Sequence, residues 1–293
     1  MSLRPIDYAM GIAVPLTWGM GFVFAKAAME HFPPIFLMSL RFAVTALALV
    51  WFVRVPLPHL RKIFGITLVA AAIQYSLTFT GLKSLDASIA ILVVQLEVPF
   101  LALVGGIFLK ESVSRRKWLG IAVALVGIAI IGGTPRLAGA WIPMLLVVGG
   151  AFAWAVGQAM VRRVQGVDGW TMTAWVAVFA APQLLVMSLI FESGHVRAVE
   201  SANWIVWTTV VYLGLVMTAF GYGLWYTLVR RHPISTVGPF LLLLPFFSVA
   251  AAAIFLGERL TWQATLGGLV LLAGVGVIVT EGRDILLKRR LAD

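Results

Sequence analysis

The stretch IFLKE at residues 107–111 returns as IFLGE at residues 254–258, a shift of 147 positions. Other residues of the chain echo each other at the same distance. The shift relates Tyr75, Ser88, Gly120 and Gly127 to Tyr222, Ser235, Gly267 and Gly274. A repeat of this length predicts a chain built from two similar halves.

The composition indicates a lipid environment. Of the 293 residues, 61% are hydrophobic and only 12% are charged, and the mean hydropathy is +1.00. A soluble domain carries about twice that charged fraction. The net charge of +10 does not indicate nucleic-acid binding, because the basic residues are dispersed between apolar segments. The chain has no cysteine, which excludes disulfides, thiolate catalysis and cysteine metal sites.

Apolar segments divide the chain into ten parts. Each is close to the 20 or so residues that a helix needs to cross a bilayer, and none shows the short alternation of a membrane β-barrel. We therefore predict an all-α integral membrane protein with ten transmembrane helices. The predicted spans are residues 7–29, 34–53, 63–82, 86–109, 117–133, 140–161, 170–191, 204–229, 234–256 and 261–280.

The basic residues predict the orientation of these helices. Of the 22 Lys and Arg residues, 16 fall in one set of alternating loops together with both termini, and four fall in the other set. Cytoplasmic loops of membrane proteins carry the excess of Lys and Arg. This distribution favours ten spans with both termini in the cytoplasm. The two remaining basic residues, Lys26 and Arg41, fall within spans.

The repeat and the helix count together predict inverted halves. Near the start of each half the shift is 136, which relates Trp18 to Trp154. Each half holds five predicted helices, an odd number, so the second half must enter the membrane from the opposite side. We predict one membrane domain made of two inverted five-helix repeats, residues 1–136 and 137–293. Such repeats are typical of transporters with a site near the bilayer midplane.

Three features together resemble a known family: the opening TWGMGFVFAKAAMEHFPPIFLMSLRF at residues 17–42, the paired IFLKE and IFLGE segments, and the five-plus-five arrangement. The chain resembles the EamA-type branch of the drug/metabolite transporter superfamily, and within it the bacterial amino-acid exporters of the YddG type. The resemblance implies a basket-like fold of ten helices with a central cavity lined by helices 1, 3, 4, 6, 8 and 9. It also implies efflux of amino acids or other small metabolites across the bacterial cytoplasmic (inner) membrane.

Polar and aromatic residues within the spans are the candidates for the binding site, because polar groups are costly in hydrocarbon unless they face protein or a water-filled cavity. Aromatic walls with a few hydrogen-bonding groups are usual for small-molecule sites. For each aromatic residue, packing between helices is an equally good interpretation. The substrate-binding candidates are Trp18, Phe22, Gln74, Tyr75, Thr78, Gln95, Trp154, Gln158, Tyr222 and Tyr226.

Lys26 and Arg41 lie toward the outer ends of their predicted helices. Long basic side chains at such positions reach the membrane interface by snorkelling. We therefore favour a structural role over ligand binding, for instance a pair between Lys26 and Glu30 one turn later.

Two prolines interrupt the fourth and ninth spans at nearly matching positions. Pro99 has no amide hydrogen, so we expect the carbonyl of Gln95 to lose its helical partner and the helix to kink. Pro245 lies one residue off the 147-residue shift. Proline helices in matching positions of inverted halves point to the binding site and to hinges of alternating access. Transmembrane helices also tolerate proline for structural reasons alone.

Glu97 is the only acidic residue near the middle of a predicted span. It is the candidate for proton coupling, with a paired structural charge as the alternative. Gln95 and Glu97 lie about 200° apart around a regular helix, so they face one cavity only if the kink turns them. The sequence leaves open whether transport is proton-coupled or facilitated diffusion.

These features predict a secondary transporter that exports amino acids, aromatic and neutral ones first, by alternating access. The alternatives are an exporter of drugs, nucleobases or other metabolites with the same fold and, more remotely, an integral membrane enzyme. No GxxxxGK[ST] motif for ATP and no HExxH motif for a metal occurs in the sequence, which disfavours a primary pump and a metalloenzyme. We expect no cofactor, no metal and no catalytic residue, a small-molecule substrate, and a functional monomer in the bilayer.

Overall fold

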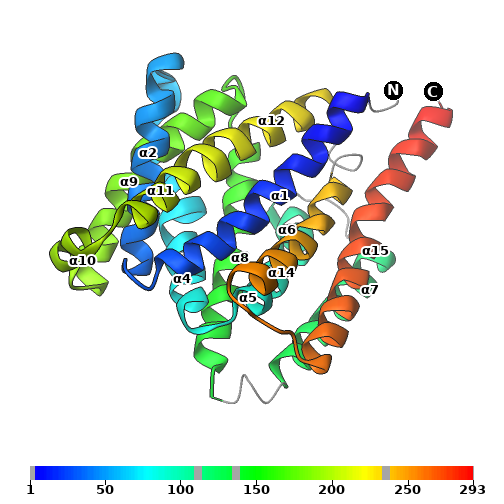
Figure 1. The fold of residues 1–293 in the computed structure, drawn as a ribbon. Helices are drawn as coiled ribbons and strands as arrows, with labels where there is room; N and C mark the ends of the chain where they lie inside the picture. The colour runs from blue at the N-terminus through cyan, green and yellow to red at the C-terminus, as the bar shows by residue number, and fades with distance from the viewer. Residues whose placement is uncertain (1–3, 109–113, 134–138, 233–237, 293) are drawn as a thin grey trace.

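The computed structural model describes residues 4–108, 114–133, 139–232 and 238–292. These residues form a bundle of helices, and no strand occurs in them (Figure 1). The α-helices are α1 (Pro5–Ala28), α2 (Pro34–Leu49), α3 (Leu60–Thr67), α4 (Gln74–Ser84), α5 (Ala87–Val94), α6 (Glu97–Phe108), α7 (Arg115–Gly132), α8 (Trp141–Arg162), α9 (Gly169–Phe191), α10 (His195–Ser201), α11 (Trp204–Tyr212), α12 (Gly221–Arg231), α14 (Leu244–Phe255) and α15 (Trp262–Ala292).

The long apolar segments of the sequence are helical, which confirms the prediction of an all-helical membrane fold. In the described residues, eight helical segments are long and apolar enough to cross a membrane. The two other predicted spans are also helical: α7 begins with the three basic residues of the RRK sequence, and the segment Phe240–Phe255 is shorter than the rest. A helix satisfies its backbone hydrogen bonds internally, which is the condition for crossing hydrocarbon.

The surface of the bundle differs from that of a soluble protein. Large apolar side chains such as Leu47, Leu189 and Leu269 are exposed on the outside of the bundle. Polar side chains, among them Gln74 and Arg41, are buried between the helices. An apolar exterior faces lipid at no cost, and the polar groups buried between the helices require partners within the protein.

The helix bounds repeat at the shift found in the sequence. The first and last residues of α4 and α12 lie 147 positions apart, and so do those of α6 and α14. The starts of α7 and α15 differ by the same number. Each of α4 and α12 follows a π-helical stretch, Leu68–Ile73 in the first case and Leu213–Phe220 in the second. The repeated sequence therefore forms repeated local structure, including a rare helical form.

Glycines bring repeat-related helices into backbone contact. A Cβ atom at Gly120 would lie 2.8 Å from the carbonyl oxygen of Gly274, and one at Gly127 would lie 2.7 Å from that of Gly267. These four glycines are the ones that the 147-residue shift relates in the sequence. Small residues allow close helix packing in lipid. As a result α7 and α15 pack along their length at one side of the bundle (Figure 1).

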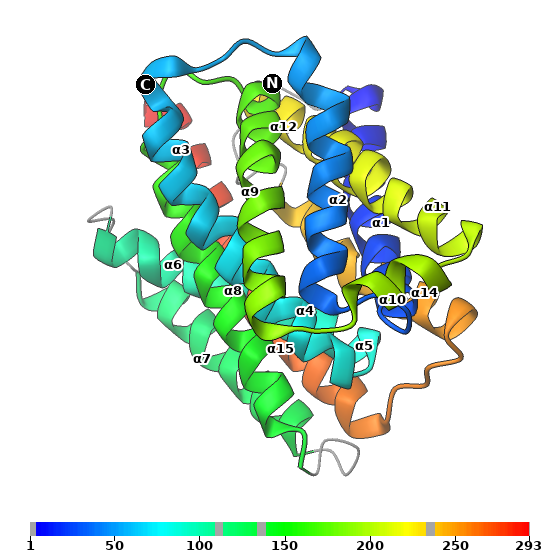
Figure 2. The ribbon, with the colours of Figure 1, turned by 90° about the vertical axis from the view of Figure 1, so that its left-hand side faces the viewer.

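The remaining long helices surround the centre of the molecule. α8 packs closely on the third span, because Gly150 meets Thr78 and Gly157 meets Ala70 with no room for a side chain. α2 lies beside α9 (Figure 2), and α1 packs against α14 and α12. The first residue of α1 and the last turns of α15 lie at the same end of the bundle (Figures 1 and 2).

The side chain of Glu258 caps the start of a helix within the fold. The carboxylate of Glu258 accepts hydrogen bonds from the backbone N–H groups of Ala87 (2.7 Å) and Ser88 (2.9 Å) and from the Ser88 hydroxyl (2.5 Å) at the start of α5. Gly257, at φ +66°, ends α14 in the left-handed conformation that glycine favours and presents Glu258. The last two residues of IFLGE, Gly257 and Glu258, therefore have structural roles as a helix end and a helix cap. The related Glu111 and Ser235 lie outside the described residues.

Candidate functional site

A small cavity of about 50 Å³ lies among the second, third, sixth, seventh and eighth predicted spans. Its wall is mainly aromatic and aliphatic, with two hydroxyl-bearing threonines, one amide and two tyrosines. The lining residues are Phe42, Ala70, Ala71, Tyr75, Trp154, Gln158, Val161, Met172, Thr173, Val176, Thr218 and Tyr222. This mixture of apolar surface and a few polar groups is what small-molecule sites use.

The two π-helical stretches shape the cavity from opposite halves of the sequence. Ala70 and Ala71 come from the first stretch, Thr218 comes from the second, and a tyrosine follows each stretch. The hydroxyls of Tyr75 and Tyr222, which are repeat-related, are 3.3 Å apart and share a hydrogen bond. A π-helical turn widens a helix and is frequent at functional sites.

Four of the predicted substrate-binding residues line this cavity: Tyr75, Trp154, Gln158 and Tyr222. The residues of the wall that the sequence did not single out are mostly apolar, and they come from α2, α8, α9 and the two π-helical stretches. The resemblance implied a cavity lined by helices 1, 3, 4, 6, 8 and 9. In this structure the second and seventh spans contribute, whereas no described residue of the first, fourth or ninth span does.

The other predicted binding residues pack behind or beside the wall. Trp18 lies 4.7 Å from Tyr222 between ring centroids, and Phe22 stacks on Phe79 at 5.6 Å. A Cβ atom at Gly221 would lie 2.5 Å from the indole nitrogen of Trp18. These aromatic rings therefore fill helix contacts in this structure, and their part in substrate binding stays a prediction.

The amides and hydroxyls near the wall are also engaged in helix packing. Gln74 donates a hydrogen bond to the Thr78 hydroxyl (3.2 Å) one turn later in α4, where α8 covers both residues. Gln95 is buried at the junction of α5 and α6 and does not line the cavity. The side chain of Tyr226 lies outside the described part of the structure.

The fourth span breaks one turn before Pro99, between α5 and α6. Around the break the N–H groups of Gln95, Leu96 and Val98 bond to the carbonyls three residues earlier, at 3.0–3.2 Å. The expected interruption is present, but the carbonyl of Gln95 keeps a partner, because it accepts from the N–H of Val98 at 3.2 Å. The tighter turn replaces the bond that proline removes.

The related position in the ninth span also changes form. A 3₁₀ segment, Gly238–Leu243, ends where α14 begins, and Pro245 lies in the first turn of α14. Glu97 holds the corresponding first position of α6. A carboxylate there faces the positive end of the helix dipole. Among the described residues no hydrogen bond or ion pair involves the Glu97 side chain, so its role in coupling stays a prediction.

Lys26 and Arg41 behave differently from one another. The ammonium group of Lys26 donates to the carbonyl oxygens of Leu82 (3.0 Å) and Lys83 (2.7 Å) at the end of α4. The structural role is as expected, but the partner is a helix C-terminus and not Glu30, because the last carbonyls of a helix have no partner of their own. Arg41 does not snorkel to the interface: it is fully buried inside the bundle.

A second hollow, of about 440 Å³, opens at the connection between α8 and α9. It is lined mainly by residues of that connection. Val161 and Met172 belong to its wall and also to the wall of the central cavity. These two side chains therefore stand between the central cavity and the end of the bundle where α8 meets α9.

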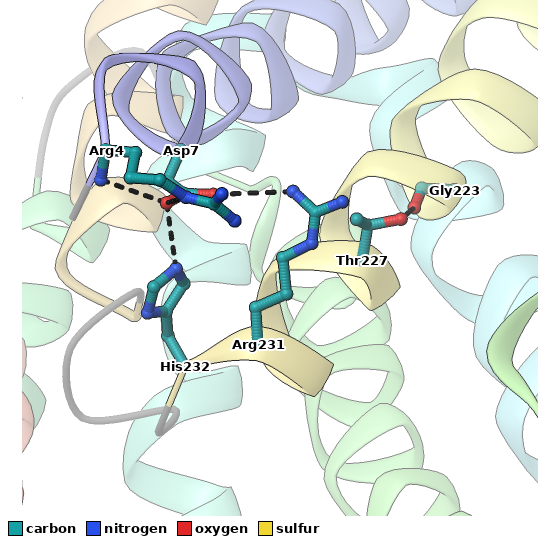
Figure 3. Close-up of polar contacts among 6 residues, drawn as sticks. All are labelled: Arg4, Asp7, Gly223, Thr227, Arg231 and His232. Atoms are coloured by element: carbon teal, nitrogen blue, oxygen red, sulfur yellow. Dashed lines mark hydrogen bonds and ion pairs between the residues drawn. The ribbon is translucent and has the colours of Figure 1, made fainter. Parts of the chain in front are cut away.

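An ionic cluster that the sequence did not reveal joins the start of α1 to the end of α12 (Figure 3). The fully buried carboxylate of Asp7 accepts from the backbone N–H of Arg4 (3.0 Å). It also lies 3.6 Å from the Arg231 guanidinium and 3.1 Å from the His232 ring. The Thr227 hydroxyl donates a hydrogen bond to the carbonyl oxygen of Gly223 within α12 (2.7 Å). The cluster fastens one helix from each half at the end of the bundle that holds the termini.

The sequence model of the EamA-like transporter family matches this chain twice, at residues 6–133 and 141–280. The chain belongs to the EamA-like transporter family. The paired match corresponds to the two halves whose helix bounds repeat.

Relatives with assigned names are similar over nearly the whole chain. A protein of Salmonella typhimurium (strain LT2) named "Probable amino-acid metabolite efflux pump" is 30% identical over 284 residues, 93% of this chain and 94% of its own. The protein of the same name from Escherichia coli (strain K12) matches to the same extent. A "Probable terminal-alkyne amino-acid exporter" of Streptantibioticus cattleyicolor is 29% identical, over 100% of this chain and 98% of its own.

A solved crystal structure shares the fold. It superposes with a TM-score of 0.66 over 99% of both chains, at 18% sequence identity. The family and the apolar helices make this chain a transporter, not an enzyme, and a multi-pass protein of the inner membrane.

Proposed function

We propose that this protein exports amino acids and related small metabolites from the cytoplasm by alternating access through the central cavity. The observation that carries the proposal is the cavity itself, in which an aromatic wall and hydroxyl and amide groups from both halves meet. The names of the three relatives support amino acids as the substrate class. Aromatic rings suit apolar side chains and also the ammonium group of an amino acid.

The architecture that we propose is two inverted five-helix repeats, residues 1–136 and 137–293, with both termini in the cytoplasm. The paired family match, the repeated helix bounds and the position of both chain ends at one end of the bundle support it. The excess of Lys and Arg in the loops assigns that end to the cytoplasm. One chain contains the whole cavity, so we propose a functional monomer.

The size of the cavity supports movement as part of the mechanism. At about 50 Å³ it is far smaller than the roughly 300 Å³ at which ligand pockets begin. A bound amino acid therefore requires the walls to separate. We propose that the helix junctions before Glu97 and Leu244, with Pro99 and Pro245 beside them, are the hinges, since repeated broken helices are the moving parts of such transporters.

The route from the cytoplasm that we propose begins at the hollow between α8 and α9. Arg163 in that connection belongs to the basic loops, and the hollow meets the central cavity at Val161 and Met172. Parting of these two side chains opens the cavity to the cytoplasm. Separation of Tyr75 from Tyr222 follows as the two halves rock.

The test is uptake of radiolabelled compounds into proteoliposomes that contain the purified protein. We expect uptake of aromatic and neutral amino acids, competition among them, and no competition from nucleobases or organic cations. Trp154→Ala should reduce uptake at least about tenfold, as loss of a buried aromatic contact of ~1.5–3 kcal/mol predicts. Trp204→Phe, at an exposed position, serves as the control. If no amino acid is taken up and none competes, the proposed substrate class is wrong.

A further inference from the structure

Arg41 is a buried cation without a counter-charge. It lies on α2 inside the bundle, and its side chain has no exposed surface. Among the described residues no carboxylate lies within ion-pair distance of its guanidinium. Removing an unpaired charge from water is costly, and an ionisable residue within a membrane protein indicates a functional site by default.

Neutral groups hold the guanidinium in place. Its Nε donates to the Thr218 hydroxyl (2.7 Å), and one Nη lies at the limit of hydrogen bonding from the Tyr75 hydroxyl (3.5 Å). The other Nη has only the sulfur of Met38 (3.7 Å). The guanidinium carbon lies 4.9 Å from the ring centre of Tyr75 and 5.3 Å from that of Phe42. These contacts orient the cation but do not neutralise it.

The residues that hold Arg41 are residues of the cavity wall. Phe42, Tyr75 and Thr218 line the cavity, so the positive charge lies one side chain behind its surface. The Thr218 hydroxyl donates to the carbonyl of Leu213 (2.8 Å) and accepts from Arg41. When the Tyr75 oxygen accepts from Arg41, its hydrogen points toward Tyr222. The wall thus places the positive potential of the guanidinium against the cavity.

We propose that Arg41 is the counter-charge for a carboxylate on the transported molecule. The carboxylate lies in the cavity against the hydroxyl side of the wall at Tyr75, with Arg41 behind it. One cation matches one negative charge, which suits a carboxylate better than a doubly charged phosphate ester. The proposal rests on the proposed function and narrows it: the preferred substrates carry a carboxylate, and amides or amines of the same shape bind more weakly.

A purely structural role predicts a different outcome from this one. A clamp that only positions Tyr75 and Thr218 affects all ligands alike. A counter-charge affects carboxylates selectively, because the electrostatic attraction of a buried cation depends on the charge of the ligand. The ratio between ligands that differ only in charge therefore separates the two roles.

The experiment measures binding to the purified full-length protein by tryptophan fluorescence. Trp154 lines the cavity and is the reporter. The four probes share one aromatic ring: phenylalanine, 3-phenylpropionate, phenylalaninamide and phenethylamine. We expect the two carboxylates to bind at least about tenfold more tightly than the amide and the amine, as attraction between opposite charges across one side chain inside the protein predicts. Arg41→Lys should keep the preference, Arg41→Gln should abolish it, and the exposed Arg197→Gln should change nothing.

Each other outcome overturns the proposal. It is wrong if the wild-type protein shows no preference, if it binds none of the four, or if Arg41→Gln weakens all of them equally. If Arg41→Gln does not fold, the other two proteins provide the test: the proposal requires that both the wild-type protein and Arg41→Lys prefer the carboxylates. An Arg41-dependent preference without uptake of any amino acid in proteoliposomes refutes amino-acid export and leaves the carboxylate site standing. Amino-acid uptake without the preference refutes the carboxylate site and leaves amino-acid export standing.

Discussion

Glu258 should be a stabilising cap of α5, and Glu258→Ala tests it. The carboxylate accepts three hydrogen bonds at 2.5–2.9 Å, two of them from backbone N–H groups that have no partner within the helix. Hydrogen bonds to a charged group contribute about 1.5–3 kcal/mol each when buried, and loss of an N-terminal cap costs ~0.5–2 kcal/mol where water replaces it. Because the cap is only partly buried, we expect a loss of about 2–3 kcal/mol in total.

The assay is thermal unfolding of the purified protein in detergent at one fixed scan rate, followed by tryptophan fluorescence. A loss of ~2–3 kcal/mol corresponds to a fall in Tm of roughly 4–10 °C for a chain of this size. Glu258→Gln keeps an acceptor oxygen, so we expect it to lower the Tm by about half as much. Ser88→Ala removes only one of the three bonds and should have a smaller effect.

The control is Glu200→Gln, a substitution of an exposed glutamate in α10. It removes the same charge without breaking a cap, so we expect no change in Tm. A Tm for Glu258→Ala that matches wild type and Glu200→Gln would refute the capping role. It would also leave the glutamate that ends both IFLKE and IFLGE without a structural explanation in this chain.

Three further predictions concern packing, coupling and the ionic cluster. Gly127→Val should cost ~1–3 kcal/mol of stability, since a Cβ there would lie 2.5 Å from the backbone nitrogen of Leu271; Gly65→Ala, with open space around it, should cost nothing in the same thermal assay. Glu97→Gln should abolish any dependence of transport on an imposed pH gradient, and an unchanged rate and pH dependence would remove Glu97 from the mechanism. Asp7→Asn should speed hydrogen exchange in the first turns of α1, whereas unchanged exchange would show that the cluster of Figure 3 does not hold this end.

Much of the fold follows from the sequence because lipid leaves few alternatives. Long apolar segments must be helical, and the 147-residue shift in the sequence reappears in the bounds of α4 and α12. The glycines that the shift relates meet one another across α7 and α15, with Gly120 against Gly274. Hydropathy and repetition can be read directly from the sequence, without knowledge of the tertiary packing.

Arg41 shows where the sequence misleads. It lies seven residues into α2, about 10 Å from the helix start, which is within reach of the interface for a long side chain. Which way it points depends on the rotation of α2 against α9 and the third span, and hydropathy carries no information about that rotation. Thr45, one turn later and also buried, lies on the same face of α2. This pair of polar residues was the sequence signal that Arg41 points into the bundle.

The cavity wall could be predicted only in part for a related reason. Tyr75, Trp154, Gln158 and Tyr222 are polar or aromatic residues within spans, so the sequence singled them out. Small apolar residues such as Ala70 line the same cavity but are indistinguishable from residues of any helix contact. The π-helical stretches before α4 and α12 could not be predicted either, because helix propensity does not distinguish a π-helix from an α-helix.

The most direct test of the proposed site is a density map of the protein in lipid with a bound aromatic amino acid. We predict density for the ligand between Tyr75, Trp154 and Tyr222, with its carboxylate toward the Arg41 side and the cavity wider than the present 50 Å³ or so. Ligand density elsewhere, for instance between α7 and α15, together with an unchanged central cavity, would contradict it.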